Sequence, residues 1–351
     1  MSAALDARIA AIAAAAKAWQ DPEFMPRAKA AHATLSAPNR FTEEAVAFAV
    51  NQQKHHLASP KKLRGWFGDG DGSSERVRIG IAPEGATPLD GLRALAAVWL
   101  AGHDPVVRVP ASSPHLLPAF AESVASEGDL STAFAADDAQ VLSQTDALLV
   151  AGPHDAVDAW REQAVGAGIP AERLHLSTRR TTVAVIDGTE DFDARIGLAE
   201  DILLHEGLGE ANVALLWAPK GIDADPYFEA FSGFRQIMPA HADTDGVLEM
   251  PRAFLKAAKQ PYAWGDGVLV SRGDPDVQTA GHLRWAEYDS LDAVTAWIDA
   301  HQNALGGVVA TEAVARRVQI PPALHIKPGD AHRSRLGTAA DRALMAFVRS
   351  L

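Results

Sequence analysis

Cysteine is absent from the 351 residues of this sequence. Its absence excludes disulfide bonds, thiolate metal ligands and a cysteine nucleophile, whatever fold the chain adopts. The sequence also lacks a run of about 18 consecutive apolar residues, the length that a membrane-spanning helix requires. Its start, "MSAALDARIAAIAAAAKAW", lacks the basic start, the long apolar core and the cleavage site of a signal peptide. We therefore expect a cytoplasmic protein without a membrane span.

Basic residues are too few to balance the acidic ones. The chain has 32 Lys and Arg against 45 Asp and Glu, which gives a formal net charge of −13. Nucleic acids and anionic membranes select basic surfaces, so neither is expected as a partner. The hydrophobic content of 48% is ample for buried cores, and the length fits two domains better than one.

Helices are predicted at 4–19 and at 43–57, the second capped by Thr42. The Gly-, Asp- and Ser-rich run "LRGWFGDGDGSSER" predicts a loop, and strands alternate with helices after it. The predicted strands are 77–83, 105–110, 146–152, 181–187, 213–217, 267–271, 282–288 and 306–311. Continuous apolar strands that alternate with helices predict doubly wound parallel sheets, which is an α/β fold.

The pattern breaks near Gly188, which separates two predicted domains. The first, 1–188, would combine the N-terminal helices with an α/β domain, and the second would span 189–322. In the first domain, "IAPEGATPLDG" joins a strand to a helix that Thr87 is expected to cap, with Asp90 at the capping-box position. That helix N-terminus could bind an anion, and a plain strand–helix connection explains it equally well.

Other chemical motifs are weak. His55 and His56 are adjacent and cannot share a helix face, and "HEGLGE" lacks the second histidine of a zinc-binding helix. A solvated loop explains the cluster of His241, Asp243 and Asp245, so no metal site is expected. A phosphate-binding Gly-Lys-Ser/Thr loop and a Gly-x-Ser-x-Gly nucleophile turn are both missing.

Six segments, in order, carry a resemblance to a known family. They are "FTEEAVAFAV", "RVRIGIAPEGATPLDGLRALAAVWLAGHDPVVRVPASSPHLLPAF", "DALLVAGPHDAVDAW", "RRTTVAVIDGTED", "SLDAVTAWIDAHQNALGGVVAT" and "HIKPGDAHRSRLGTAADRALMAFV". The sequence resembles the acyl-CoA reductase (LuxC-type) family of the aldehyde dehydrogenase superfamily over nearly its whole length. The resemblance implies an aldehyde-dehydrogenase-like fold with a cofactor-binding-type domain before the catalytic-type domain. It also implies that residues 323–351 pack back on the first domain or form a dimer interface.

The stretch "HEGLGEANVALLWAP" resembles the family's nucleophile loop, which reads Gly-x-Gly-Cys-Arg-Asn-Val. Its glycines, Asn212 and Val213 match, but Glu210 stands at the position of the nucleophilic cysteine. A carboxylate is a poor substitute, because attack would form a mixed anhydride from a weak nucleophile. Ala86 stands where the family has the Asn that helps to bind the oxyanion, and losing such a donor costs about 10²–10³ in rate.

The resemblance further implies NADP or NAD as cofactor, a long-chain acyl-CoA, acyl or aldehyde ligand, and a homodimer. The implied cofactor contacts lie at strand ends: Gly85, Thr87, Arg108, Gly152 and Pro153. Arg108 replaces the family's Lys and keeps its charge. One hypothesis is a non-catalytic binding or assembly protein. The other is an active NAD(P)H-dependent acyl-CoA or aldehyde oxidoreductase with a non-cysteine mechanism, and hydrolysis with Glu210 as general base is a third option.

Overall fold

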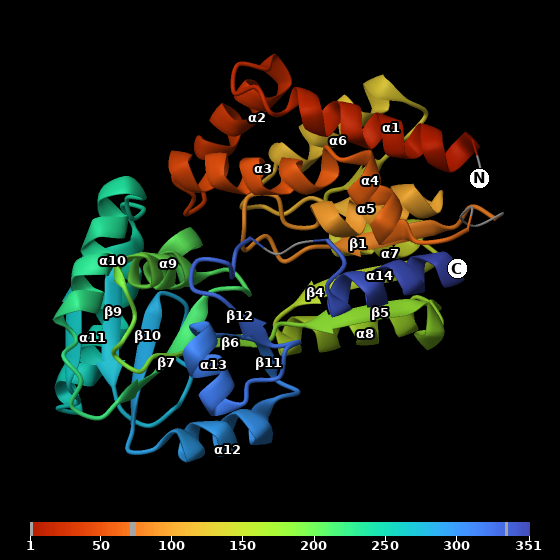
Figure 1. Ribbon diagram of the computed structural model, residues 1–351. Helices are drawn as coiled ribbons and strands as arrows, with labels where there is room; N and C mark the ends of the chain where they lie inside the picture. Colours follow the sequence, from red (N-terminus) through yellow and green to blue (C-terminus); the bar gives the residue numbers. More distant parts are fainter. Residues whose placement is uncertain (1–2, 71–74, 334–335) are drawn as a thin grey trace. The chain divides into compact units, whose positions relative to one another are not determined.

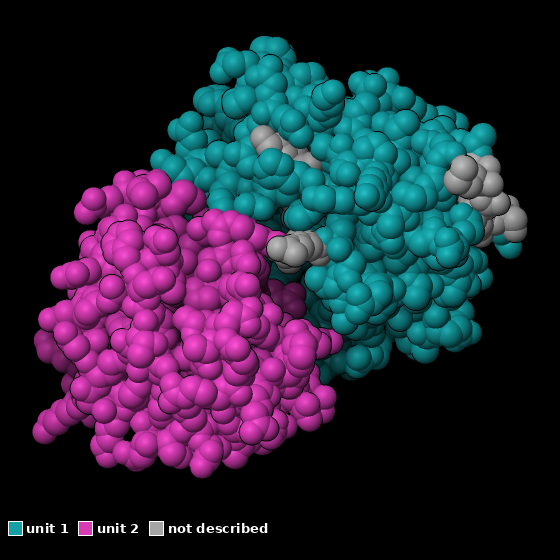
Figure 2. Space-filling model, in the orientation of Figure 1, with its two compact units in different colours: residues 1–179, 335–351 teal, residues 180–334 magenta. Residues whose placement is uncertain are grey.

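The computed structural model describes residues 3–70, 75–333 and 336–351, and it contains two compact units. Unit 1 comprises residues 1–179 and 335–351, and unit 2 comprises residues 180–334 (Figures 1 and 2). The division falls before the strand at 181–187, which the sequence placed in the first domain. Of the C-terminal segment expected from residue 323, the part from residue 335 belongs to unit 1.

Unit 1 is built on a five-stranded parallel sheet. Its strands are β1 (Arg78–Ala82), β2 (Asp104–Arg108), β3 (Ala133–Ala135), β4 (Ala147–Gly152) and β5 (Leu174–Thr178). Their spatial order is β3-β2-β1-β4-β5, and each neighbouring pair is parallel. The direction in which successive strands are added to the sheet reverses between β1 and β4. Doubly wound sheets bind their ligands outside the carboxyl ends of the strands at such a point.

Helices cover both faces of this sheet. On one face lie α5 (Leu92–Ala101), α6 (Leu116–Glu127) and the N-terminal helices α1 (Ala3–Ala18), α2 (Met25–Leu35), α3 (Glu43–Leu57) and α4 (Pro60–Phe67). On the other face lie α7 (Asp138–Gln144) and α8 (His154–Gly166), and a short 3-10 turn, η1 (Ala171–Arg173), precedes β5. The C-terminal helix α14 (Ala339–Ser350) packs on α4 and α5.

Two local expectations for unit 1 are wrong. The expected loop from residue 63 begins inside α4, because Ser59 caps a helix there and Leu63, Trp66 and Phe67 are buried; residues 71–74 of that loop lie outside the described ranges. The expected helix start at Thr87 is also wrong, because α5 begins at Leu92. Thr42, by contrast, does cap α3: the Ala45 N–H donates to its hydroxyl at 3.2 Å.

Unit 2 is built on a seven-stranded sheet. Its strands are β6 (Thr181–Val185), β7 (Val213–Pro219), β8 (Tyr262–Gly265), β9 (Val268–Arg272), β10 (His282–Tyr288), β11 (Leu305–Val309) and β12 (His325–Ile326). The order is β12-β11-β6-β7-β10-β9-β8, and only the edge pair β8–β9 is antiparallel. This pair forms a two-residue hairpin, because Asp266 (φ 50°) and Gly267 (φ 67°) adopt the left-handed conformation that such turns require.

The helices of unit 2 lie on both faces of its sheet. α9 (Phe192–Leu203) and α10 (Asp225–Ile237) pack together on one face, where Tyr227 and Phe228 contact the Trp285 ring. α12 (Leu291–His301) and α13 (Glu312–Val318) cover the other face, and α11 (Thr244–Ala257) packs against β9. Two parallel sheets, each wound on both sides, confirm the predicted fold class.

Candidate functional site

The loop between α9 and β7 contains Glu210, which the sequence resemblance placed at the family's nucleophile position. α9 ends at Leu203, and a tight turn, η2 (Leu204–Gly207), follows. His205, Glu206 and Gly207 have φ values of 53°, 57° and 69°. Left-handed backbone costs a non-glycine residue about 1–2 kcal/mol, so surrounding contacts must hold His205 and Glu206 in place.

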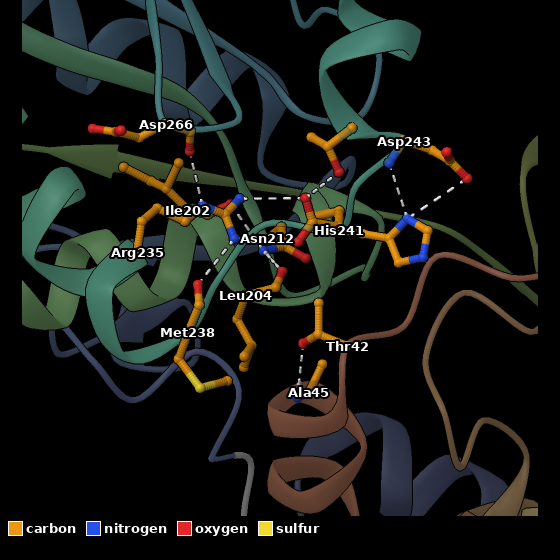
Figure 3. A network of polar contacts seen from close by, with 12 residues as sticks. Thr42, Ala45, Ile202, Leu204, Asn212, Arg235, Met238, His241, Asp243 and Asp266 are labelled. Carbon is orange, nitrogen blue, oxygen red and sulfur yellow. Dashed lines mark hydrogen bonds and ion pairs between the residues drawn. The ribbon is translucent and has the colours of Figure 1, made fainter. Parts of the chain in front are cut away.

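Asn212 makes several of those contacts, and it is 5% exposed. Its Nδ2 donates to the backbone oxygens of Leu204 at 2.8 Å and Ile202 at 3.0 Å (Figure 3). Its Oδ1 accepts from the Gly209 N–H at 2.9 Å. The side chain thus bonds to the end of α9 and to the turn that leads into β7. Asn212 is the buried one of the three predicted catalytic positions, and its side chain is used to hold the loop.

A second set of contacts ties residues 329–333 to α9. Asp201 is fully buried and accepts from the Gly329 N–H at 2.7 Å and the Ala331 N–H at 3.0 Å. Burial raises the pKa of Asp201 to about 8, against the opposing effect of these two donors. His332 lies 3.3 Å from Asn212 Nδ2, and its ring centroid is 5.7 Å from that of His205. Burial lowers the pKa of His332 to about 3 and that of His205 to about 4, so both imidazoles are neutral near pH 7.

The charged side chain that the turn buries is Glu206, not Glu210. Glu206 is 4% exposed and pairs with Arg235 of α10 at 3.2 Å, while the Thr244 hydroxyl donates to its Oε2 at 2.6 Å. Burial lowers the pKa of Arg235, and the carboxylate of Glu206 opposes the shift. Arg235 also donates to the backbone oxygens of Asp266 and Met238 (Figure 3). Sequence analysis missed this cluster of Glu206, Arg235 and Thr244, because the three side chains come from separate elements and match no motif.

A small pocket opens beside this ion pair. It encloses about 340 Å³, counted with the solvent at its mouth, and it is lined by Glu206, Arg235, His282 and the backbone around Gly207 and Gly281. His282 bonds to Ser271 at 2.7 Å, and burial lowers its pKa to about 4. Of the polar side chains that line the pocket, Glu206 and Arg235 are bonded to each other and His282 is bonded to Ser271.

Glu210 itself is exposed and does not line this pocket. Its Oε1 accepts from the Arg180 N–H at 3.4 Å, and its backbone oxygen accepts from the Thr182 hydroxyl at 3.2 Å. Ala211 is partly exposed beside it. The loop thus presents the carboxylate of Glu210 to solvent. The sequence resemblance places the nucleophilic cysteine of the family at this residue.

The predicted cofactor contacts lie at strand ends of unit 1. Gly85, Ala86 and Thr87 follow β1, Arg108 ends β2, and Gly152 ends β4 with Pro153 after it. The turn at Gly85 is crowded: a Cβ there would lie 2.6 Å from Ser112 Oγ. The sheet therefore brings these residues to one edge, as the order of the strands predicts.

The turn after β1 is filled by a carboxylate of the chain. Asp90 does not complete a capping box with Thr87; its Oδ2 accepts from the Gly85 N–H at 2.8 Å. The N–H groups of Gly91 and Ala86 also bond to the Asp90 carboxylate, whose pKa is raised by burial. Of these three N–H groups, that of Gly91 lies at the N-terminus of α5, where a bound phosphate would use it.

The cationic side chains at this edge also have acidic partners. Arg108 pairs with Asp138 at 2.5 Å, and Arg179 pairs with Glu84. A dinucleotide pyrophosphate would have to displace Asp90 from the N–H groups and would meet Glu84 as a second negative charge. The residues of the turn after β1 therefore do not fit a pyrophosphate in this conformation.

Neither a metal centre nor a membrane helix is found in the part of the chain that the structure describes. Three or more His, Asp or Glu side chains nowhere cluster there in a way that could hold a metal ion. Within the same ranges, every helix is too short or too polar to cross a bilayer.

Comparison with known proteins gives structural relatives only. No family model matches the sequence, and no curated protein does. An NAD-dependent benzaldehyde dehydrogenase from Corynebacterium glutamicum superimposes with a TM-score of 0.70 at 11% identity, over 97% of this chain and 83% of the other. A putative aldehyde dehydrogenase from Burkholderia cenocepacia gives 0.70 at 14%, over 99% and 86%.

A third structure was solved with a cofactor. It is the glyceraldehyde-3-phosphate dehydrogenase from Methanocaldococcus jannaschii complexed with NADP, with a TM-score of 0.62 at 11% identity over 87% of this chain and 80% of the other. These likenesses show that the chain has an aldehyde-dehydrogenase-like fold, as the sequence resemblance implied.

Proposed function

We propose that the chain is a non-catalytic binding or assembly protein built on the acyl-CoA reductase variant of this fold. The observation that carries the proposal is the absence of cysteine from the chain, together with Glu210 at the position that the sequence resemblance assigns to the nucleophile. No serine or threonine lies between His205 and Val213 to replace it. Thioester chemistry needs a nucleophile that attacks the acyl carbon, and an exposed carboxylate is too weak for that step.

Two other positions that the resemblance assigns to the family's site support the same proposal. Ala86, at the oxyanion-donor position, has no side-chain donor, so the stabilisation that such a donor supplies is missing. Asn212, which the resemblance places next to the nucleophile, bonds to the backbone of its own loop. Asn212 therefore holds its own loop, and Ala86 presents no reactive group.

The turn after β1 supports a loss of cofactor function as well. Asp90 bonds to the backbone N–H groups there, and Arg108 is paired with Asp138. When bound, NAD(P)H would supply the hydride for reducing an acyl group. In this chain, binding at this turn requires that Asp90 move away from the Gly85 N–H.

The test is covalent acylation followed by reduction. We expect the intact mass of the wild type to remain unchanged after incubation with a long-chain acyl-CoA, and NADPH oxidation to stay at background. Glu210→Cys returns one thiol to the loop and should gain the mass of one acyl group, faster than Val165→Cys, a thiol at an exposed site of α8 (54% exposed). Reduction should still fail, because Ala86 and Asp90 are unchanged.

Three other outcomes would contradict parts of this proposal. NADPH-dependent reduction by the wild type would show an active oxidoreductase with a non-cysteine mechanism and would end the proposal. Slow acyl-CoA hydrolysis by the wild type that disappears in Glu210→Gln would instead identify Glu210 as a general base. Equal acylation of Glu210→Cys and Val165→Cys would show that the loop no longer binds an acyl thioester.

A further inference from the structure

Helix α14 is held on unit 1 by apolar and polar contacts. Met345 and Val348 are buried in the core of the unit. Asp341, in the first turn of the helix, pairs with Arg93 of α5 at 3.2 Å, and its backbone oxygen accepts from the Trp66 indole N–H of α4 at 3.1 Å. α14 therefore covers apolar surface of unit 1 and is attached to α4 and α5 (Figure 1).

Three histidines from other parts of unit 1 lie at α14: His56 of α3, His103 after α5 and His175 of β5. Both ring nitrogens of His103 are bonded. The Val77 N–H donates to Nδ1 at 3.2 Å, and Nε2 lies 2.8 Å from the Val348 backbone oxygen. Because a carbonyl oxygen only accepts, Nε2 carries the hydrogen and Nδ1 has none. A proton added to Nδ1 would point at the Val77 N–H, so His103 holds α14 in this way only as a neutral imidazole.

His56 lies in a site that disfavours a positive charge. It is only 9% exposed, and its Nδ1 has no hydrogen-bond partner among the residues that the structure describes. Four charged or titratable groups act on it: Arg93, Lys62, His55 and Asp341. Three of them are basic, and the Asp341 carboxylate already accepts from Arg93 and from the N–H groups of residues 337 and 338. Burial, followed by Arg93, lowers the pKa of His56 to about 4.

The other two histidines are also disfavoured as cations. Burial lowers the pKa of His175, whose ring centroid lies 5.2 Å from that of Phe347 in α14. Burial also lowers the pKa of His103, more than the Val348 carbonyl and Asp104 raise it, and Arg8 adds to the lowering. All three imidazoles are therefore neutral near pH 7.

We propose that α14 is an acid-sensitive latch, which protonation of His56, His103 and His175 releases while the sheet and the other helices of unit 1 stay folded. Once α14 leaves, each imidazole reaches water and can take up a proton that the docked helix excludes. α14 lies outside the sheet of unit 1, so its release breaks none of the hydrogen bonds between strands. Release exposes Met345 and Val348 together with the core that they cover, an apolar surface that is hidden near pH 7.

The direction and size of the effect follow from the protons that are taken up. An exposed histidine binds its proton near pH 6.5 and a docked one only at lower pH, so the docked helix loses stability as the pH falls below about 6.5. For His56 alone, a pKa of about 4 in the docked state shifts the release equilibrium about 20-fold between about pH 7 and pH 5. His103 and His175 add to this factor. Release requires neither a cofactor nor an acyl ligand.

Thiol labelling of single-cysteine variants tests the release, because the chain has no cysteine of its own. Met345→Cys places a thiol at a site that is 3% exposed, so a pyridyl disulfide reaches it only after α14 leaves. Val165→Cys, at a site of α8 that is 54% exposed, gives the rate of an accessible thiol at each pH. We expect the rate of Met345→Cys, divided by that of Val165→Cys, to rise at least about 20-fold from about pH 7 to about pH 5, and to fall again when the pH is restored.

Two controls separate release of the helix from opening of the whole unit. Val124→Cys places its thiol at a fully buried site of α6 in the same core, and its relative rate should stay nearly constant. His56→Leu, which keeps an uncharged side chain of similar size, should abolish most of the rise in Met345→Cys. His115→Leu, at an exposed site before α6, should leave the rise unchanged.

Three results would overturn the proposal. Equal rises for Met345→Cys and Val124→Cys would show that unit 1 opens as a whole. A relative rate of Met345→Cys that stays constant between the two pH values would show that α14 is not released. A rise that is the same in His56→Leu as in His115→Leu would show that His56 does not control the helix.

Discussion

Asn212→Ala is expected to destabilise the fold far more than a change at its exposed neighbour Glu210. The Asn212 amide group has two N–H bonds, and its best acceptors are the backbone oxygens of Leu204 at 2.8 Å and Ile202 at 3.0 Å. Its oxygen accepts from Gly209 at 2.9 Å. Alanine removes all three bonds and leaves buried backbone groups without these partners.

The size of the loss in the free energy of unfolding follows from these three hydrogen bonds. Each contributes about 1 kcal/mol net, and buried groups left unsatisfied cost somewhat more, so the loss should be about 3 kcal/mol. Glu210→Ala removes an exposed side chain whose 3.4 Å contact with the Arg180 N–H is long, so its cost should stay below about 0.5 kcal/mol. Asn212→Asp should cost more than alanine at pH 7, because a carboxylate would then face the two carbonyl oxygens.

Urea unfolding of the three variants measures the loss, and hydrogen exchange of peptides covering 200–214 localises it. We expect faster exchange at Gly209 in Asn212→Ala and unchanged exchange in Glu210→Ala. If Asn212→Ala lost less than about 1 kcal/mol, the claim that Asn212 holds this loop would be wrong. A catalytic role for Asn212 would then regain support.

Three other perturbations have defined outcomes. Arg235→Ala should lower the free energy of unfolding by about 3–5 kcal/mol, because it leaves Glu206 buried without its cation. Arg235→Met combined with Glu206→Gln should lower it much less in the same urea assay. In the unfolded chain the pKa of each histidine is near 6.5, whereas burial lowers the pKa of His205 and His332 in the folded chain. Below about pH 6.5, protons therefore bind the unfolded chain preferentially, and the free energy of unfolding falls. Between about pH 7 and pH 5, His205→Asn should lose about 2 kcal/mol less of its free energy of unfolding than the wild type. Asp90→Ala should cost about 1–3 kcal/mol, and inorganic pyrophosphate should raise its melting temperature more than that of the wild type; equal shifts in both proteins would show that Asp90 does not fill the anion position.

Apolar strand runs made much of the fold predictable. "RIGIA" and "VALLWAP" are buried strands because β-branched and aliphatic residues follow one another without polar interruption. β5 was missed, since "LHLST" has polar residues and is only partly buried at the edge of its sheet. Edge strands bury less, so their hydrophobic pattern is weaker.

The candidate site was less predictable, because its contacts join distant residues. The sequence aligned Glu210 and Asn212 with a known loop, but it could not show that Glu206 is the buried carboxylate. That outcome depends on two left-handed residues, His205 and Glu206, and on Arg235 from another helix. Asp90 was expected to cap a helix, yet the left-handed Gly91 delays α5 and directs the carboxylate to Gly85. Local propensity does not encode such choices.

The chain leaves unit 1 at residue 179 and returns to it at residue 335, which has a consequence for synthesis on the ribosome. Met345 and Val348 of α14 belong to the core of unit 1, and Asp341 bonds to Arg93. At about 5–20 residues per second, unit 1 waits roughly 10–30 s after residue 179 for this last helix. Unit 2 is synthesised during that interval and leaves the ribosome before α14, so it can complete its fold first. The order of folding is therefore expected to be inverted, with the later-translated unit finished before the earlier one.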